Sequence, residues 1–204
     1  LWTLYKDYER RYAAWEQHKS TAPPVMIVVC NNTLVSNLVY RYIAGWDTKV
    51  SGQTILRNGN LPLFNNVNGD GWQAYPNTIL VDSRQLESGE GLSDDFKRVA
   101  KGEIASFVED YRRRYPERSA EDISEADLLR EVMNTVGKAG KLGERVRCVV
   151  SVSMLTEGWD VNSVTHILGV RAFSTQLICE QVVGRGLRRM SYDINDAGRF
   201  SPEY

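Results

Sequence analysis

The residue types best suited to chemistry lie near the end of the chain, in the segment QVVGRGLRR at residues 181–189. On a helix, Gln181, Arg185 and Arg188 share one face, because they are spaced four and three residues apart. Each guanidinium presents a planar fork of N–H donors that can meet two phosphate oxygens at once. The segment therefore favours a helix face that binds an oxygen-rich anion. The alternative is a basic helix end that solvent or a salt bridge neutralises.

A second polar segment, SVSMLTEGWD at residues 151–160, follows a run typical of a buried strand. It brings the hydroxyls of Ser153 and Thr156 and the carboxylate of Asp160 to the carboxyl end of that strand, where parallel sheets bind their ligands. Hydroxyls can hold a phosphate, and a carboxylate can hold ribose hydroxyls. The alternative is a strand-ending turn whose polar side chains satisfy only the neighbouring backbone.

In this order and spacing, the two segments resemble motifs V and VI of superfamily 2 helicases and translocases. The segment PVMIVVCNNT at residues 24–33 stands where motif IV would be. Within the superfamily, the sequence SVSMLTEGWDVNSVTHILGVRAF followed by QVVGRGLRRM is most similar to the Res subunit of type III restriction enzymes. The resemblance is close over residues 146–190 and loose over residues 1–192.

The resemblance implies an α/β fold, with a RecA-like parallel sheet flanked by helices, as the second P-loop NTPase-type lobe of a two-lobed ATP motor. In such motors ATP sits between the lobes, and the first lobe supplies most of the ligands for Mg²⁺. Arg185 and Arg188 match the arginines that reach the γ-phosphate from the second lobe. Gln181 matches the residue that positions the nucleotide or its attacking water. These three are the catalytic residues that the resemblance predicts.

The same resemblance assigns contacts outside the catalytic set. Ser153 and Thr156 are the candidates for the DNA backbone. Many superfamily members carry a threonine where Val152 stands here, so the residue of motif V that contacts phosphate stays open. Four residues are candidates for contact with the nucleotide: Glu157, Gly158, Asp160 and Gly184.

Two parts of an ATPase site are missing from the sequence. The nearest approach to a phosphate loop is Gly137–Gly143, which lacks a hydroxyl after its lysine, and no acid cluster of the DEAD type is present. Since the sequence also begins at Leu1 rather than Met, we expect a fragment of a longer parent. The parent, rather than this chain alone, is then the enzyme. It is expected to be an ATP-dependent DNA helicase or translocase, with any endonuclease activity in a domain further downstream.

Two other functions remain open. The lobe could be a nucleic-acid-binding or partner-binding module that takes no part in hydrolysis, or it could belong to another superfamily 2 enzyme, such as a repair or RNA helicase. The resemblance to type III restriction enzymes implies three partners: duplex DNA, the first lobe of the same parent chain and a possible methyltransferase (modification) subunit.

Hydrophobic patterning predicts alternating strands and helices, which favour a mostly parallel sheet. Continuous apolar runs predict strands at residues 25–30, 78–81, 146–152 and 164–170. Helical spacing predicts helices over residues 1–18, about 33–43, about 96–111, about 124–136 and about 174–189. In the first of these helices, an aromatic stripe is interpreted as a packing face rather than a surface that stacks on bases: Tyr5, Tyr8, Tyr12 and Trp15. Residues 51–77, rich in Asn and Gly, predict a long loop or a small hairpin. The predicted organisation has three parts: a connecting helix at 1–22, the lobe at 23–192 with an insertion at about 51–145, and a tail at 193–204.

Several side chains have predicted places within these elements. Leu34, Leu38 and Ile43 are expected to face inward from the second helix. Gly137 is the predicted C-cap of the helix that a capping box at Ser124 begins. His166, in the last strand, is interpreted as a satisfied core residue rather than a metal ligand or an acid–base catalyst, and no metal site is predicted.

The composition of the chain limits which partners and which compartment fit it. The 25 Lys and Arg against 26 Asp and Glu give a net charge of −1, so any contact with nucleic acid must be local. Cys30, Cys148 and Cys179 lie in apolar runs and far apart, which predicts buried thiols in a reducing compartment, the cytoplasm. No stretch approaches the roughly 18 apolar residues of a membrane span.

Overall fold

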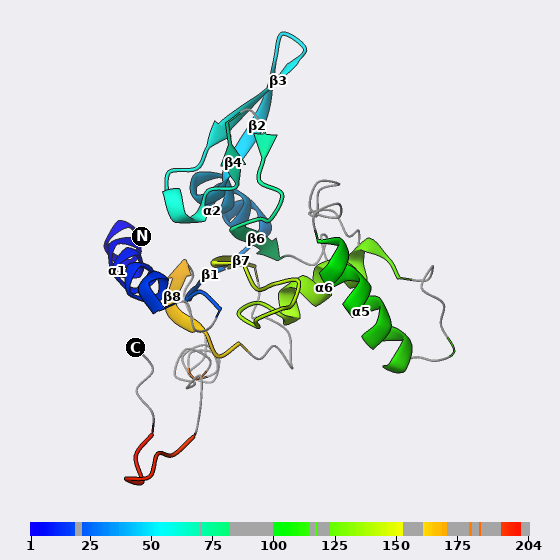
Figure 1. The fold of residues 1–204 in the computed structure, drawn as a ribbon. Coiled ribbons are helices and arrows are strands. Elements are labelled where there is room, and N and C mark those ends of the chain that lie inside the picture. The colour runs from blue at the N-terminus through cyan, green and yellow to red at the C-terminus, as the bar shows by residue number, and fades with distance from the viewer. Residues whose placement is uncertain are drawn as a thin grey trace.

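The centre of the computed structural model is strand β1 (Val25–Cys30), whose six residues are all buried. It pairs in parallel with β7 (Cys148–Ser151) on one side and with β8 (Val164–Val170) on the other. Strand β6 (Thr78–Val81) pairs with the outer edge of β7, which gives a four-stranded parallel sheet in the order β6-β7-β1-β8. This sheet and its flanking helices confirm the predicted α/β class and are consistent with a RecA-like fold (Figure 1).

The structure describes residues 1–18, 22–69, 71–81, 100–114, 117, 123–152, 161–170, 180, 184 and 193–200. All four predicted strands lie in these ranges, and β7 begins at Cys148 rather than Val146. The predicted helix at about 174–189 is described only at Glu180 and Gly184, which are both helical.

Each face of the sheet carries its own hydrophobic core, because alternate residues of a strand point to opposite faces. On one face, Val25, Ile27 and Val29 pack with helices α5 (Lys101–Arg114) and α6 (Glu125–Asn134). On the other face, Met26 and Val28 pack with helices α1 (Trp2–His18) and α2 (Thr33–Ala44). A strand covered on both sides must be apolar throughout, and the sequence of β1 meets that requirement.

The aromatic face of α1 packs against the sheet, as its spacing predicts. Tyr5, Tyr8 and Tyr12 are buried, and the hydroxyl of Tyr8 donates to the carbonyl oxygen of Pro24 at 2.7 Å. The hydroxyl of Tyr5 accepts a hydrogen bond from the backbone N–H of Leu63 at 3.0 Å. These rings are therefore part of the core and are not available to stack on bases.

Helix α2 begins as predicted but turns a different face inward. Asn32 caps it, with its side-chain oxygen accepting from the backbone N–H of Val35 at 2.9 Å. Ile43 is buried as expected, but the expectation for Leu34 and Leu38 was wrong, because these side chains are 72% and 58% exposed. The helix carries two apolar stripes one residue apart, and the stripe that includes Val35 and Val39 packs on the sheet instead.

The Asn- and Gly-rich region forms hairpins. Strands β2 (Gly45–Val50) and β3 (Gln53–Asn58) pair antiparallel and project away from the sheet (Figure 1). Their two-residue turn, Ser51 and Gly52, has positive φ at both positions, as a tight hairpin turn requires. A short 3₁₀ helix, η1 (Pro62–Phe64), and the hairpin of β4 (Val67–Asn68) and β5 (Gly71–Trp72) then lead to β6.

The segment at about 51–145, predicted as an insertion, supplies β6, α5 and α6. The predicted capping box is present, since Ser124 and Asp127 exchange hydrogen bonds at the start of α6. The prediction that Gly137 is the C-cap was wrong, because α6 ends at Asn134 and Thr135 is the cap. Gly137 instead has a positive φ of 73° in the turn that follows, against the side chain of Ser163.

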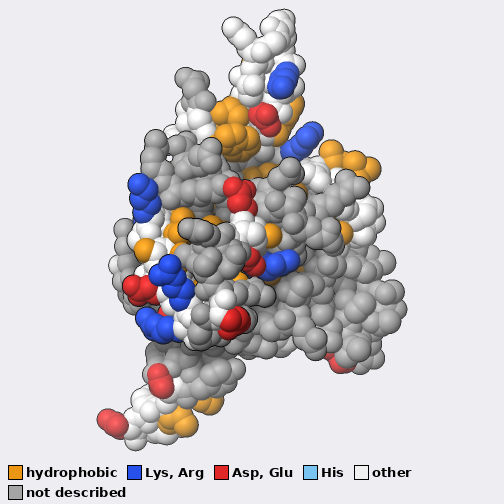
Figure 2. Space-filling view, turned by 90° about the vertical axis from the view of Figure 1, so that its right-hand side faces the viewer, with side chains coloured by type: hydrophobic (Ala, Val, Ile, Leu, Met, Phe, Trp, Pro, Cys, Tyr) orange, Lys and Arg blue, Asp and Glu red, His pale blue; other side chains and the backbone are white. Residues whose placement is uncertain are grey.

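Charges of both signs are interspersed among the described side chains on the face shown in Figure 2. On α5, Arg113 pairs with Glu109 and Asp110, which fits a solvated helix end. None of the helices that the structure describes is long and apolar enough to cross a membrane.

The two leucine environments give a test of the core. Leu129→Ala in α6 removes a side chain that is 2% exposed and should lower the free energy of unfolding by about 2–5 kcal/mol. Leu34→Ala in α2 is the matched control and should change it by no more than about 0.5 kcal/mol. Urea unfolding followed by circular dichroism measures both, and equal losses would contradict the assigned inner face of α2.

Candidate functional site

The carboxyl ends of three adjacent strands lie together at one edge of the sheet. Val29 of β1 is level with Ser151 of β7, and Cys30 is level with Val170 of β8. Because the strands are parallel, the chain leaves all three from this same edge, which we call the carboxyl edge. The segment that resembles motif IV contains β1, and the segment that resembles motif V begins at Ser151, the last residue of β7. The chain leaves β8 at the same edge toward the segment that resembles motif VI.

Almost all the predicted site residues lie outside the described residues, so the structure shows the strands from which the chain leaves toward them rather than their side chains. Gly184, the exception, is helical and exposed, and a Cβ built on it would meet no atom within 4 Å. The others are the predicted catalytic residues Gln181, Arg185 and Arg188, the predicted nucleotide contacts Glu157, Gly158 and Asp160, and the predicted DNA contacts Ser153 and Thr156.

The described part of the carboxyl edge is formed by strand ends and by the start of α2. Asn31 is exposed there, and Asn32 is held by its capping hydrogen bond to Val35. Ser151 is buried at the end of β7, and the N–H of Val152 donates to the carbonyl oxygen of Val81 at 3.3 Å, which keeps β6 and β7 aligned to their ends. The edge is thus a well-defined base for the segments that follow.

Two of the three thiols lie in the sheet. Cys30 and Cys148 are both fully buried and unpaired, as predicted, while Cys179 lies outside the described residues. Burial raises the pKa of both thiols, and that of Cys148 is raised strongly. A thiol held protonated in an apolar core is a poor nucleophile, so neither is a candidate for catalysis.

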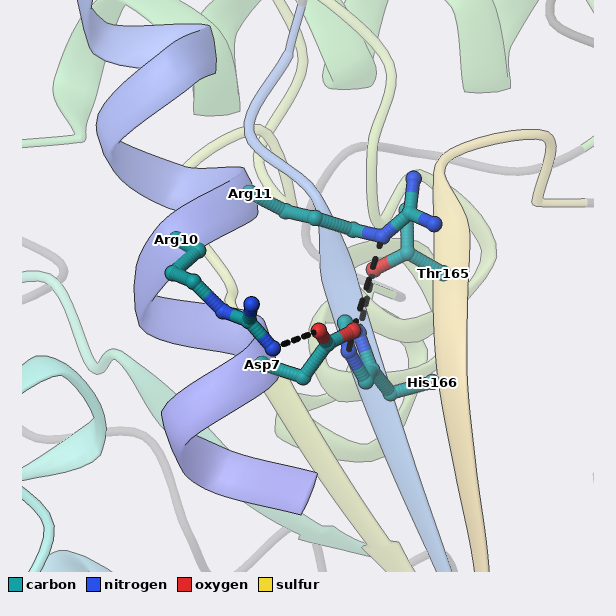
Figure 3. A network of polar contacts seen from close by, with 5 residues as sticks. All are labelled: Asp7, Arg10, Arg11, Thr165 and His166. Carbon is teal, nitrogen blue, oxygen red and sulfur yellow. Dashed lines mark hydrogen bonds and ion pairs between the residues drawn. The ribbon is translucent and has the colours of Figure 1, made fainter. Parts of the chain in front are cut away.

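A second polar cluster lies where α1 packs on the edge strand β8 (Figure 3). The Nε2 atom of His166 is 3.1 Å from Oδ2 of Asp7, and Oδ1 of Asp7 is 2.6 Å from Nη2 of Arg10. The Nε atom of Arg11 is 3.8 Å from Oδ2 of the same carboxylate. Asp7 thus joins a buried imidazole to two guanidinium groups near the surface.

A β-bulge shapes this cluster. Val25 pairs with Val164 and Met26 pairs with His166, so Thr165 is an extra residue in β8. Bulges redirect side chains, and here the Oγ1 atom of Thr165 lies 2.8 Å from Nδ1 of His166. Since a carboxylate only accepts hydrogen bonds, Nε2 of the neutral ring donates to Asp7 and Nδ1 accepts from the Thr165 hydroxyl.

The electrostatics of the cluster favour a neutral imidazole beside an ionised carboxylate. Burial lowers the pKa of His166, and the nearby Asp7 only partly opposes that shift. The hydrogen bond from His166 is the largest cause that lowers the pKa of Asp7, and Arg10 and Arg11 lower it further. His166 has hydrogen-bond partners at both ring nitrogens, which agrees with its interpretation as a satisfied core residue.

The sequence offered little sign of this cluster, because 159 residues separate Asp7 from His166. The available signal was a stripe beside the aromatic face of α1, where Asp7, Arg10, Arg11 and Ala14 recur at helical spacing. No group of three or more His, Cys, Asp or Glu side chains is placed to hold a metal ion within the part of the chain that the structure describes.

Comparison of the chain with protein-family models, with curated proteins and with solved structures finds no match. The assignment of a function therefore depends on the motifs in the sequence and on the geometry of the sheet.

Thiol burial gives a direct chemical prediction. In the native chain at pH 8, Cys30 and Cys148 should resist alkylation by iodoacetamide, because both are inaccessible and their thiolate fractions are small. Both should be alkylated rapidly in 8 M urea, as peptide mass spectrometry after quenching would measure. Rapid native labelling of Cys148 would contradict its place in the core.

The histidine gives a prediction for pH dependence. Because the pKa of His166 is lower in the folded chain than its ordinary value of about 6.5, the unfolded chain binds more protons as the pH falls through that value. The free energy of unfolding should therefore decrease between pH 7 and pH 5, and it should decrease less in the variant His166→Gln. Urea titrations at each pH measure this, and equal slopes in the two proteins would show that His166 does not titrate as stated.

Proposed function

We propose that this chain is the second RecA-like lobe of an ATP-dependent DNA helicase or translocase, in a parent that resembles the Res subunit of type III restriction enzymes. One observation carries the proposal. The segment resembling motif IV contains β1, the segment resembling motif V begins at the end of β7, and the chain runs from β8 toward the segment resembling motif VI. These three strands are adjacent and parallel, so the chain leaves all three from one carboxyl edge.

The topology supports the proposal because the motifs need to act together. The segment resembling motif V begins at Ser151, the last residue of β7, and the chain toward motif VI leaves from β8, on the other side of β1. Because β1 lies between these two strands, the chain leaves toward both segments from the same edge, although more than 20 residues separate the segments in the sequence. An antiparallel arrangement would have sent them to opposite ends of the sheet.

In this proposal, the arginines provide charge stabilisation. Arg185 and Arg188 neutralise the charge that develops on the γ-phosphate of an ATP bound between this lobe and the first lobe. Gln181 orients the nucleotide or its attacking water. Arginine residues in this role accelerate phosphoryl transfer by about 10³–10⁵ where they have been measured. The Mg²⁺ ion belongs mainly to the first lobe.

Motif V links the nucleotide to the nucleic acid. Glu157, Gly158 and Asp160 face the nucleotide, and Ser153 and Thr156 contact the DNA backbone. The two lobes close on ATP and reopen after hydrolysis. This motion moves the DNA contacts of Ser153 and Thr156 along the duplex. The partners are duplex DNA, the first lobe and a methyltransferase subunit, and the reducing cytoplasm is the expected location.

One sequence feature favours a second candidate, a nucleic-acid-binding or partner-binding module without hydrolysis. The chain contains no phosphate loop, so it has no ATPase site of its own. This candidate predicts DNA binding that does not depend on nucleotide, whereas the motor predicts that hydrolysis and DNA binding are coupled.

The test is ATP turnover by the full-length parent, with and without duplex DNA. DNA should stimulate the wild type, and the variant Arg185→Ala, Arg188→Ala should lose about a hundredfold or more of the stimulated rate. Arg113→Ala, which removes an exposed arginine from α5, is the matched control and should retain the full rate.

Two outcomes would contradict the motor. If the double variant retained the DNA-stimulated rate, Arg185 and Arg188 would not be the finger arginines. If the wild type bound duplex DNA but showed no ATP turnover, the binding module would be the better assignment. Stimulation by RNA in place of duplex DNA would point instead to an RNA helicase of the same superfamily.

A further inference from the structure

We propose that the groove between α1 and β8 binds a phosphate group through Arg10 and Arg11. The phosphate can come from a nucleic-acid backbone or from a free phosphate compound, since both present the same oxygens to a guanidinium. This site is separate from the carboxyl edge, because Thr165 and His166 lie near the start of β8. Val170, at its other end, is four residues beyond His166, or about 13 Å along a strand.

The surface is hollowed where α1 packs on β8. A groove of about 320 Å³ lies along the contact between the two elements. It is lined by Asp7, Arg10, Arg11, Ala14, Pro24 and Thr165. The side chains of Arg10 and Arg11 are 79% and 56% exposed, so a ligand can reach both from solvent.

The groove carries more hydrogen-bond donors than its own carboxylate can accept. Two guanidinium groups carry ten N–H donors between them, and one carboxylate cannot accept that many. In the structure Asp7 engages Nη2 of Arg10 and Nε of Arg11 while also accepting from His166. The Thr165 hydroxyl directs its proton to His166, so the donors for an anion are the remaining guanidinium N–H groups.

The charge of the groove favours an anion. Two arginines and one aspartate give the groove a net charge of +1 when His166 is neutral, as its buried position favours. An anion entering the groove therefore gains from the guanidinium groups more than it loses to Asp7. A planar guanidinium pairs well with the tetrahedral oxygens of phosphate, which a single lysine would meet only as a point charge.

The carboxylate that holds the two arginines is itself held in place by the core. Asp7 does not move freely on the helix surface, because it is hydrogen-bonded to a ring that is 5% exposed. That ring is fixed by Thr165 on one side and by an edge contact with the ring of Tyr8, at 5.6 Å between centroids. An anchored carboxylate that holds two arginines reduces the entropy lost when a ligand immobilises them.

A purely structural role leaves this arrangement unexplained. The aromatic face of α1 already packs on the sheet, and the hydroxyls of Tyr5 and Tyr8 form hydrogen bonds to the backbone. Exposed ion pairs such as those of Arg10 and Arg11 contribute little to stability. The position of α1 thus does not require two guanidinium groups at the groove.

The experiment uses the imidazole of His166 as a local reporter, which is practical because the chain has only two histidines. The full chain is labelled with ¹⁵N, and His166→Gln assigns the signal. Inorganic phosphate and a duplex DNA oligonucleotide are titrated separately at constant pH 7.5. In the wild type, at least one of them should shift the His166 signal in a saturable way.

The variant Arg10→Gln, Arg11→Gln keeps a polar side chain with N–H donors at both positions but shortens it and removes the charge. It should bind about tenfold or more weakly, since it loses the charge-assisted hydrogen bonds to the phosphate oxygens. Arg113→Gln is the matched control and should bind like the wild type. A far-ultraviolet circular dichroism spectrum and a urea midpoint that match those of the wild type show that the unliganded double variant remains folded.

The two titrations separate the sources. A shift with inorganic phosphate alone supports a site for free phosphate compounds, and a shift only with DNA supports a contact to the nucleic-acid backbone. The proposal is overturned if neither ligand moves the His166 signal, or if the double variant binds as tightly as the wild type. Because the readout needs no ATP turnover, this result does not depend on the motor assignment.

Discussion

Strand β1 imposes the main constraint on this structure, because it is buried on both faces and hydrogen-bonded along both edges. A six-residue apolar strand of this kind needs a helix layer on each side, and α1 with α2 and α5 with α6 supply those layers. It also needs a partner strand on each edge. Its parallel pairing with β7 and β8 then determines where the chain leaves all three strands.

The same constraint gives the edge strand β8 two different ends. At its carboxyl end, the chain continues toward the arginine-containing segment QVVGRGLRR. Near its amino end, β8 is no longer regular, and the bulge at Thr165 brings His166 to the polar stripe of α1. An interior strand with two partners would tolerate such an irregularity poorly, so the position of β8 at the edge allows the cluster to form.

Sequence patterns predicted those features that one element determines by itself. The continuous apolar runs located the four strands of the described sheet, the capping box located the start of α6, and the aromatic spacing located the inner face of α1. The patterns did not decide between two apolar stripes on α2, because Leu34 and Val35 are equally hydrophobic neighbours and only the packed sheet selects one. They also could not choose between a loop and a hairpin at residues 51–77, or pair Asp7 with His166, since both outcomes depend on contacts distant in the sequence.

The central claim is that the segments leaving the carboxyl edge form one nucleotide-responsive site in the parent protein. Hydrogen–deuterium exchange of the full-length parent tests it most directly, with and without a non-hydrolysable ATP analogue and duplex DNA. The account predicts that residues 153–160 and 181–189 gain protection together when both ligands are present, while the β2–β3 hairpin does not change. If neither segment gained protection, or if only one of them responded, the carboxyl edge would not be the site proposed for it.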